Sequence, residues 1–447
     1  MKLTAAILAL ITATAFAQGP LAPPGAPAPT MKTLDEIHTK VAESGEKRTP
    51  ISAIPFAITQ PGSYYLTGNL STALAVDGIS IDAKNVTIDL NGFRMTGFGA
   101  GLVAIKMTNA SVNTQTMVVK NGVIDGFATA IGGVSSSVNA ASIENVHIQG
   151  GDGIQLREAN NARIHGCVLQ DSVVTSGILN VFGAISAGRG AVVTECRVAA
   201  ATGSVYGVAI YAYENGVVRD STVTDTGVSG IFCGPHGTVS NCAVTGTGST
   251  GISVSTGVVD GCSVKGIFDT GIAATGTIHR CSVSLSGTTV YGIRFFGGKI
   301  SDCSVDGITG TGVWAEQACI VEGTTVAEFD TGIYSLGANT VRGCEVQNCD
   351  TGIRMGSRGT AFGNSIIGES SAAPARTGIL VTSTDNTLDG NRLTNCATGI
   401  SITGTGNIIH RNSLRNNTTP LSIVGGNEAG PTGTPSTATS PFANLVY

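Results

Sequence analysis

The stretch Phe329–Ile353, FDTGIYSLGANTVRGCEVQNCDTGI, contains the phrase Asp-Thr-Gly-Ile twice, at Asp330 and Asp350. The same phrase occurs upstream at Asp269, and related copies read SGI, STGI, RTGI or ATGI. A phrase that recurs with variations in its first residues is typical of a turn that leads into a strand. There, Asp or Thr bonds nearby backbone amides, and we expect the glycine to adopt a positive φ.

A glycine followed by Ile or Val recurs along more than half of the chain. Between Gly230 and Gly352 the step is nearly constant at about 20 residues, and the steps on either side are longer. The full series is Gly153, Gly177, Gly207, Gly230, Gly251, Gly271, Gly292, Gly312, Gly332, Gly352, Gly378 and Gly399. A nearly fixed period of this length indicates a solenoid.

A second column of equivalent positions follows each glycine by 10 to 13 residues in the regular coils. Cysteine fills it at Cys167, Cys196, Cys242, Cys262, Cys281, Cys303 and Cys344. Small polar residues fill it at Ser221, Thr324, Asn364, Asn391 and Asn412. We expect these side chains to point inward and to stack at the strand spacing of about 4.8 Å.

The composition favours strands over helices. Glycine numbers 62 and charged residues are 12%, which is poor material for amphipathic helices. In units such as GISV, alternation places the first and third residues after the glycine inward and the second outward. Two short strands per repeat fit an all-β, single-stranded right-handed parallel β-helix, whereas the pattern of leucine-rich repeats is missing.

The N-terminal part of this repeat resembles a known superfamily. The segments PISAIPFAITQPGSYYLTGNL and GISIDAKNVTIDLNGFRMTG are similar to the opening coils of secreted bacterial β-helix proteins of the pectate-lyase-like superfamily. That superfamily includes polysaccharide lyases, polygalacturonase-like hydrolases and uronate epimerases. The resemblance implies a β-helix and a bias toward carbohydrate, and by itself no particular reaction.

The ends of the chain predict an exported protein. Residues 1–17 have a charged start, an apolar stretch and an Ala-Phe-Ala cleavage site, as in a signal peptide. We expect a Pro-rich linker at 18–30, a capping helix at 31–50 with Thr33 as its N-cap, the β-helix at 51–424, and a flexible tail at 425–447. A tail that folds back as a plug is the alternative for the last seven residues. The predicted location is secreted, periplasmic or at the cell surface.

Charge and cysteine spacing exclude several other classes. The formal net charge is −5, so a nucleic-acid partner is not expected. No apolar run after the leader is long enough for a membrane span. The 11 cysteines would suggest disulfides in an exported protein, but stacking at about 4.8 Å holds them too far apart. We therefore expect mostly reduced, buried thiols and no metal site built from them.

Two hypotheses concern the carboxylates of the Asp-Thr-Gly phrase. Aspartic proteases carry this tripeptide, but their motif continues with Ser or Thr and their two loops face each other from two lobes. Asp330 and Asp350 instead fall side by side on neighbouring coils and continue with Ile, which excludes the protease hypothesis. Two stacked carboxylates about 4.8 Å apart could still play a supporting acidic part or attract a cation. We favour the interpretation as turn-capping residues.

The outward positions of the strands supply the candidate site. The residue after each Gly-Ile or Gly-Val pair gives an outward column that includes Arg294, Trp314, Tyr334 and Arg354, and the next outward position gives Phe296 and Glu316. Clustered aromatic residues beside arginine suit the binding of sugar rings and their carboxylate groups. The predicted substrate-binding residues are Phe296, Trp314 and Tyr334. The candidate catalytic residues are Arg294, Arg354, Asp330, Asp350 and Glu316.

Three functions remain open on the sequence. The first is an exported protein, expected as a monomer, that binds polysaccharide or a cell-surface glycan. The second is a polyuronate lyase or epimerase with an Arg base and acidic groups, and the third is a structural adhesin or stalk. No cofactor is predicted, and calcium is left open for the lyase hypothesis. The sequence does not decide whether the protein is an enzyme.

Overall fold

The structure is a computed structural model that describes residues 32–43, 46–108, 115–133, 138–174, 183–203, 207–368 and 376–447. The chain divides into two compact units, Met1–Arg48 and Thr49–Tyr447. In the described part of the first unit, α2 spans Leu34–Glu43. Its start is a capping box, since the Thr33 amide donates to Glu36 Oε2 (2.9 Å) and the Glu36 amide donates to Thr33 Oγ1 (3.1 Å). The N-cap prediction is therefore confirmed, while the predicted signal peptide and linker lie outside the described residues.

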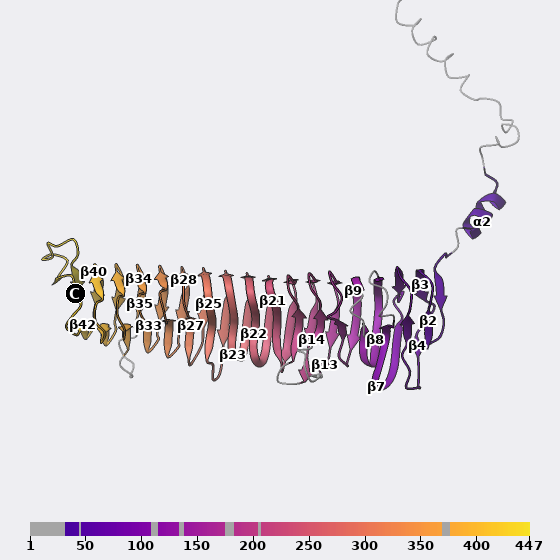
Figure 1. Cartoon of the computed structure of the whole chain (residues 1–447), viewed down its shortest axis with the longest axis horizontal. Coiled ribbons are helices and arrows are strands. Elements are labelled where there is room, and N and C mark those ends of the chain that lie inside the picture. Colours follow the sequence, from indigo (N-terminus) through magenta and orange to yellow (C-terminus); the bar gives the residue numbers. More distant parts are fainter. Residues whose placement is uncertain are drawn as a thin grey trace, which may run out of the picture. The chain divides into compact units, whose positions relative to one another are not determined.

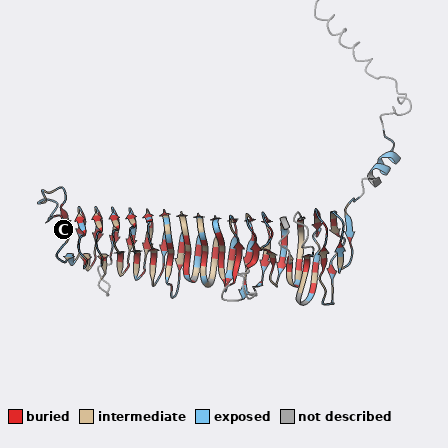
Figure 2. Ribbon diagram, viewed as in Figure 1, coloured by how far each residue is buried: buried red, intermediate tan, exposed pale blue. Residues whose placement is uncertain are grey.

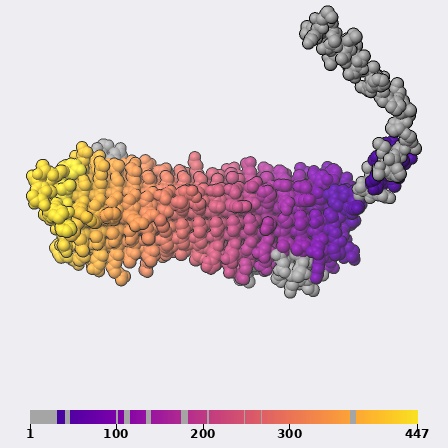
Figure 3. All heavy atoms as spheres, turned by 90° about the horizontal axis from the view of Figure 1, so that it is seen from above, coloured from indigo at the N-terminus to yellow at the C-terminus, as the bar shows by residue number. Residues whose placement is uncertain are grey.

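The second unit is a parallel β-solenoid, as predicted, and it has about 16 turns (Figure 1). Each regular coil carries three short strands, and each strand pairs in parallel with its equivalents in the coils before and after. The solenoid therefore has three faces, which we call sheets 1, 2 and 3 in chain order within a coil. In Figure 3 the colours pass along this unit in sequence order, because each coil contacts mainly its neighbours.

Most strands belong to only one of the three sheets. Sheet 1 contains β2 (Phe56–Ile58), β5 (Ile79–Ile81), β10 (Ile154–Leu156), β14 (Gly183–Ala187), β18 (Val208–Ala212), β27 (Thr311–Ala315), β30 (Thr331–Ser335), β33 (Thr351–Met355), β36 (Thr377–Val381), β39 (Thr398–Ile402) and β42 (Thr419–Ile423). Sheet 2 contains β1 (Thr49–Ile51), β3 (Gly62–Leu66), β6 (Val86–Asp89), β11 (Arg163–His165), β15 (Val192–Thr194), β19 (Val217–Arg219), β28 (Cys319–Glu322), β31 (Thr340–Arg342), β34 (Thr360–Phe362), β37 (Thr387–Asp389), β40 (Ile408–His410) and β43 (Glu428–Ala429). Sheet 3 contains β4 (Leu70–Ser71), β12 (Val168–Gln170), β16 (Arg197–Ala199), β20 (Thr222–Thr226), β24 (Ser282–Leu285), β26 (Ser304–Asp306), β29 (Thr325–Ala327), β32 (Glu345–Gln347), β35 (Ser365–Ile367), β38 (Arg392–Thr394), β41 (Ser413–Arg415) and β45 (Asn444–Val446).

Longer strands bend round the corners and belong to more than one face. They are β7 (Arg94–Met107), β8 (Gln115–Gly133), β9 (Val138–Gln149), β21 (Ser229–Ser240), β22 (Ala243–Asp260), β23 (Ser263–His279) and β25 (Tyr291–Ser301). Short additional strands are β13 (Val173–Val174), β17 (Thr202–Gly203) and β44 (Thr432–Gly433). Because β1 already begins at Thr49, the predicted helical segment 31–50 is too long and the β-helix starts two residues before the predicted boundary.

The alternation read from the sequence is present in every regular coil. β27, β30, β33, β36 and β39 all bury their second, third and fifth residues and leave the fourth partly exposed. Figure 2 shows the buried residues as a continuous band along the coils. In a solenoid, each coil buries its apolar positions against the next, so the core is a stack of similar layers and not a single cluster.

Two details of the repeat differ from the prediction. Each coil has three strands where the sequence suggested two, because a single residue with positive φ separates sheet 2 from sheet 3, as Gly343 does (φ 58°). The glycine of the Asp-Thr-Gly phrase has no positive φ. A Cβ at Gly332 would lie 2.6 Å from the carbonyl oxygen of Gly352 and 2.5 Å from Val346 Cγ1. Close packing against the same coil and the next one, and not backbone conformation, requires glycine there.

The glycine series is also displaced in the longer coils. Ile154 pairs with Ile185, and Ile185 pairs with Ile210. Ala184 and Ala209 therefore occupy the position of the repeat glycine, and Gly207 does not. Gly177 lies outside the described residues.

The predicted inward column lies at the corner between sheets 2 and 3. All 11 cysteines are free and buried, including those of this column, as expected. Cys344 Sγ lies 3.5 Å from the carbonyl oxygens of both Val321 and Arg342, within reach of its thiol proton. In the last coils asparagine fills the column. Asn364 Nδ2 donates to the Val341 carbonyl at 2.9 Å, and Asn364 Oδ1 accepts the Cys344 amide at 3.0 Å. Each asparagine thus satisfies two backbone groups that a buried corner would leave unpaired.

The C-terminal segment differs from the predicted flexible tail. Residues 425–447 contain β43, β44 and β45, and β45 pairs with β41 through Ser413 and Leu445. Asn444 is fully buried, and its Oδ1 accepts the Asn412 amide at 3.1 Å. The segment therefore continues the asparagine column and covers the edge of β41, close to the alternative in which the last residues fold back.

Candidate functional site

The outward column of sheet 1 is continuous, as predicted. Strand pairing places Arg294 beside Trp314, Trp314 beside Tyr334, and Tyr334 beside Arg354. Each of these residues is the fourth of a five-residue strand or its equivalent in β25, so its side chain points away from the core. Neighbouring members are one strand spacing apart, about 4.8 Å. We call the set Tyr291, Arg294, Phe296, Trp314, Glu316, Tyr334 and Arg354 the aromatic face.

The rings of the aromatic face form one connected array. The Trp314 ring lies edge-on to Tyr334, with centroids 4.7 Å apart and planes at 76°. On its other side Trp314 meets Tyr291 edge-on at 5.1 Å. Edge-to-face contacts of this kind stabilise a pair by about 0.5–1.5 kcal/mol beyond area burial. The contacts therefore fix the ring of Trp314 between two coils before any ligand arrives.

An arginine lies at either end of the array. The Arg354 guanidinium carbon is 4.7 Å from the centroid of the Tyr334 ring. The Arg294 guanidinium carbon is 4.8 Å from the centroid of Phe296, and Arg294 also forms an ion pair with Glu316 at 3.6 Å. Within the described residues, Arg354 has no carboxylate partner. Its charge is held over an aromatic ring and is available to an acidic group of a ligand.

Three nitrogen donors within this array are covered and have no acceptor among the described residues. They are Trp314 Nε1, Arg294 Nε and Arg354 Nε. Covered donors without an acceptor cost free energy, about 1–3 kcal/mol each by mutational estimates. A ligand oxygen that reached any of them on a small side-chain movement would recover part of that cost.

Asp330 and Asp350 do not join this array. They line a separate pocket of about 350 Å³ at the turn before sheet 1, together with Glu328, Asn348 and Arg376. Asp330 Oδ2 accepts the Gly310 amide of the preceding coil at 2.8 Å. The structure therefore places Asp330 as the turn-capping residue that the sequence favoured. The five candidate catalytic residues divide into Arg294, Glu316 and Arg354 on the face and the two aspartates beside Arg376.

Three aromatic residues of sheet 1 were not among the predicted site residues. Tyr291 pairs with Thr270 and Thr311, so it replaces the threonine that opens most sheet 1 strands. Tyr211 and Phe232 occupy the outward column further upstream, stacked at 5.2 Å with planes at 3°. Phe232 follows Gly230-Ile231, so the rule that the residue after Gly-Ile points outward would have identified it. Tyr211 was hidden because Ala209 replaces the repeat glycine.

Among the described residues, no group of three or more His, Cys, Asp or Glu side chains is placed to hold a metal ion. In the same part of the chain, no helix has both the length and the apolar character needed to cross a membrane.

The family follows from the repeat and its geometry. A family model for the right-handed β-helix region matches residues 129–287 and 288–432. The chain belongs to the right-handed β-helix family. A search of curated proteins finds no match.

Three solved structures are similar to this chain at low identity. The A-module of Azotobacter vinelandii mannuronan C-5 epimerase AlgE4 is 12% identical, with 78% of this chain and 90% of that chain covered and a TM-score of 0.32. The A-module of the AlgE6 epimerase from the same organism is 15% identical, with 83% and 91% covered and a TM-score of 0.28. The catalytic unit of the GH87 α-1,3-glucanase from Streptomyces thermodiastaticus is 13% identical, with 88% and 62% covered and a TM-score of 0.25. At these values the likeness to other β-helix proteins carries no argument about activity.

Proposed function

We propose that the aromatic face binds an acidic polysaccharide outside the cell. The observation that carries this proposal is the position of Arg354, stacked over Tyr334 at 4.7 Å beside Trp314 and without a carboxylate partner among the described residues. A sugar ring can lie against the apolar rings while its carboxylate meets the planar guanidinium in a two-bond contact. Export rests on the predicted signal peptide at residues 1–17.

The geometry supports binding more than proton abstraction. The acidic groups invoked for a lyase or epimerase, Asp330 and Asp350, line the pocket with Arg376, whereas Arg294 is already paired with Glu316. Arg354 is thus held by an aromatic ring and is oriented as an anion-binding group, whereas Glu316 compensates the charge of Arg294. Calcium, which the sequence leaves open for the lyase hypothesis, is not part of the proposal.

A glycan array probed with the purified protein tests the proposal. We expect retention on uronate-containing glycans, loss of that retention in Trp314→Ala, and unchanged retention in Ser401→Ala. Ser401 lies in the same outward column, paired with Leu380, but beyond the aromatic face. Uronate binding that survives in Trp314→Ala would contradict the proposal. Ultraviolet absorbance from unsaturated product that grows with the wild type and disappears in Arg354→Ala would replace binding by the lyase function.

A further inference from the structure

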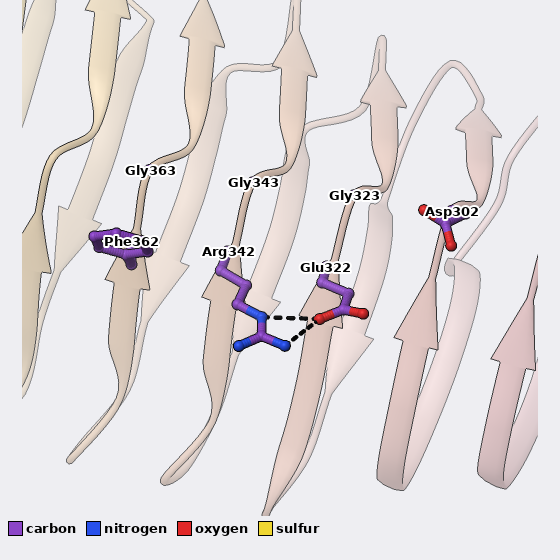
Figure 4. Close-up of a pocket in the computed structure, with 7 residues that line it drawn as sticks. All are labelled: Asp302, Glu322, Gly323, Arg342, Gly343, Phe362 and Gly363. Atoms are coloured by element: carbon purple, nitrogen blue, oxygen red, sulfur yellow. Dashed lines mark hydrogen bonds and ion pairs between the residues drawn. The ribbon is translucent and has the colours of Figure 1, made fainter.

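A second concave surface lies at the corner between sheets 2 and 3, away from the strands that carry the aromatic face. It encloses about 350 Å³ and is lined by Asp302, Glu322, Arg342 and Phe362 with the corner glycines between them. Figure 4 shows the side chains of Glu322, Arg342 and Phe362 in a row on successive coils, with Asp302 beyond them. We call this surface the corner groove.

The side chains of the corner groove combine one apolar ring with ordered polar groups. Phe362 is the last residue of β34 and is 50% exposed, whereas Ala361 in the middle of the same strand is buried. Arg342 Nε donates to Glu322 Oε2 at 2.8 Å, and Lys299 forms an ion pair with the same carboxylate. These contacts with both cations hold the pKa of Glu322 below its usual range. The carboxylate is therefore ionised and fixed at neutral pH, and it in turn orients the guanidinium of Arg342.

Glycine forms the floor of the groove, at corner positions that carry larger residues in other coils. Strand pairing makes Gly323, Gly343 and Gly363 equivalent to Asn241 and other corner residues, since each follows the last residue of a sheet 2 strand. Asn241 and Gly343 have φ values of 51° and 58°. A Cβ at Gly343 or Gly363 would meet no atom within 4 Å. Neither backbone conformation nor packing excludes a side chain at these two positions, whereas a Cβ at Gly323 would lie 2.8 Å from Asp302 Oδ1. Gly343 and Gly363 therefore have the effect of keeping the groove open.

We infer that the corner groove is a second glycan site and that its ligand is a neutral sugar chain. Glu322 is paired with both Arg342 and Lys299, and Asp302 Oδ2 lies 3.2 Å from His279 Nε2, so the groove offers hydrogen bonds without an uncompensated cation for an acidic ligand. The exposed ring of Phe362 provides a surface for one face of a pyranose, and the Asp302 carboxylate and Arg342 guanidinium can bond its hydroxyl groups. A concave, mostly apolar surface with a few placed polar groups is the usual form of a small-ligand site. This inference does not depend on the proposed function of the aromatic face.

Isothermal titration calorimetry with neutral hexasaccharides tests the inference. The probes are cellohexaose, maltohexaose and mannohexaose, with hexagalacturonate as the acidic comparison. We expect at least one neutral probe to bind the wild type. Phe362→Ala should weaken that binding at least tenfold because the ring surface is lost. Gly343→Asn should do the same by filling the groove without disturbing the corner.

Two controls separate this site from the aromatic face and from misfolding. Gly150→Asn makes the same change at a corner (φ 73°) outside the groove, where a Cβ would also meet no atom within 4 Å, and should leave neutral binding unchanged. Arg354→Ala should weaken only the acidic probe. Absence of binding by all three neutral probes would overturn the inference. So would neutral binding that Phe362→Ala and Gly343→Asn leave intact, or neutral binding that disappears in Arg354→Ala.

Discussion

Trp314 and Tyr334 lie on consecutive coils, with their ring centroids 4.7 Å apart and their planes at 76°. The solenoid positions them, since β27 and β30 pair residue for residue. Each ring is therefore oriented by the coil next to it, and the array needs no loop to hold it in place. This pre-orientation is what a polysaccharide-binding surface requires, because little side-chain freedom is lost on binding.

The contacts of Trp314 predict a measurable but moderate contribution to stability. Its two edge-to-face neighbours, Tyr291 and Tyr334, each stabilise the pair by about 0.5–1.5 kcal/mol. We expect Trp314→Ala to lower the free energy of unfolding by about 1–3 kcal/mol, as measured by urea denaturation followed by circular dichroism. A loss much larger than this would mean that Trp314 is a core residue, and its binding phenotype could not then be attributed to contact with ligand.

The asparagine column predicts a larger effect at Asn391. Its Nδ2 donates to the Ala361 carbonyl at 2.9 Å, and its Oδ1 accepts the Asn364 amide at 3.0 Å. Removing it leaves buried backbone groups unpaired at about 1–3 kcal/mol each. We expect Asn391→Ala to destabilise the protein by about 2–6 kcal/mol in urea denaturation. The outward Ser401→Ala should change stability by less than about 0.5 kcal/mol. Equal effects of the two variants would contradict the role of the column.

The buried thiols predict a loss of stability in alkaline solution. Burial raises the pKa of Cys344 and of Cys349 to about 11, against about 8.5 for an exposed thiol. Above pH of about 8.5 the unfolded chain releases these protons while the folded chain keeps them. Stability is therefore fully present below that pH and is lost as the pH rises toward 11.

The measurement is the urea midpoint at a series of pH values from 7 to 10.5. Cys344→Asn serves as the matched variant, because Asn364 already fills the equivalent position in the next coil. Its alkaline decrease should be shallower than that of the wild type. An identical decrease in both proteins would assign the effect to other titrating groups.

The C-terminal segment predicts a change in association. β45 covers β41, with Ser413 and Leu414 paired to Leu445 and Val446. Deleting residues 441–447 leaves β41 as an open edge, which is a surface that recruits other strands. We expect the deletion to produce concentration-dependent oligomers in size-exclusion chromatography with light scattering, whereas the full chain stays at one mass. A truncated protein that remains at that same mass would show that β45 does not protect the edge.

The periodicity of the sequence was enough for the fold class and for the outward column between Arg294 and Arg354. Cys344 and Trp314 were each assigned to the correct side of the sheet, because a repeat of nearly constant length converts sequence position directly into spatial position. The prediction failed where a position that requires a small residue is filled by a residue other than glycine. Alanine replaces the repeat glycine at Ala209, and this substitution hid Tyr211.

The repeat also could not show that the candidate catalytic residues fall into two separate groups. The positions of Asp330 and Tyr334 are close in sequence and recur together, but a turn lies between the aspartate and the outward strand position. The sequence shows that the two positions recur, and only the structure shows that Asp330 bonds Gly310 while Tyr334 contacts Trp314 and Arg354. The corner groove was not predicted either, because it is formed partly by the absence of side chains at Gly343 and Gly363.

The most direct test of the central claim uses Trp314, the only tryptophan in the chain, as its own reporter. The protein is titrated with hexagalacturonate and with hexamannuronate while tryptophan emission is recorded. The account predicts a saturable change in emission with an acidic probe, weakened at least tenfold in Arg354→Ala and unchanged in Ser401→Ala. Emission that stays constant with both probes, or a response that Arg354→Ala leaves intact, would contradict it.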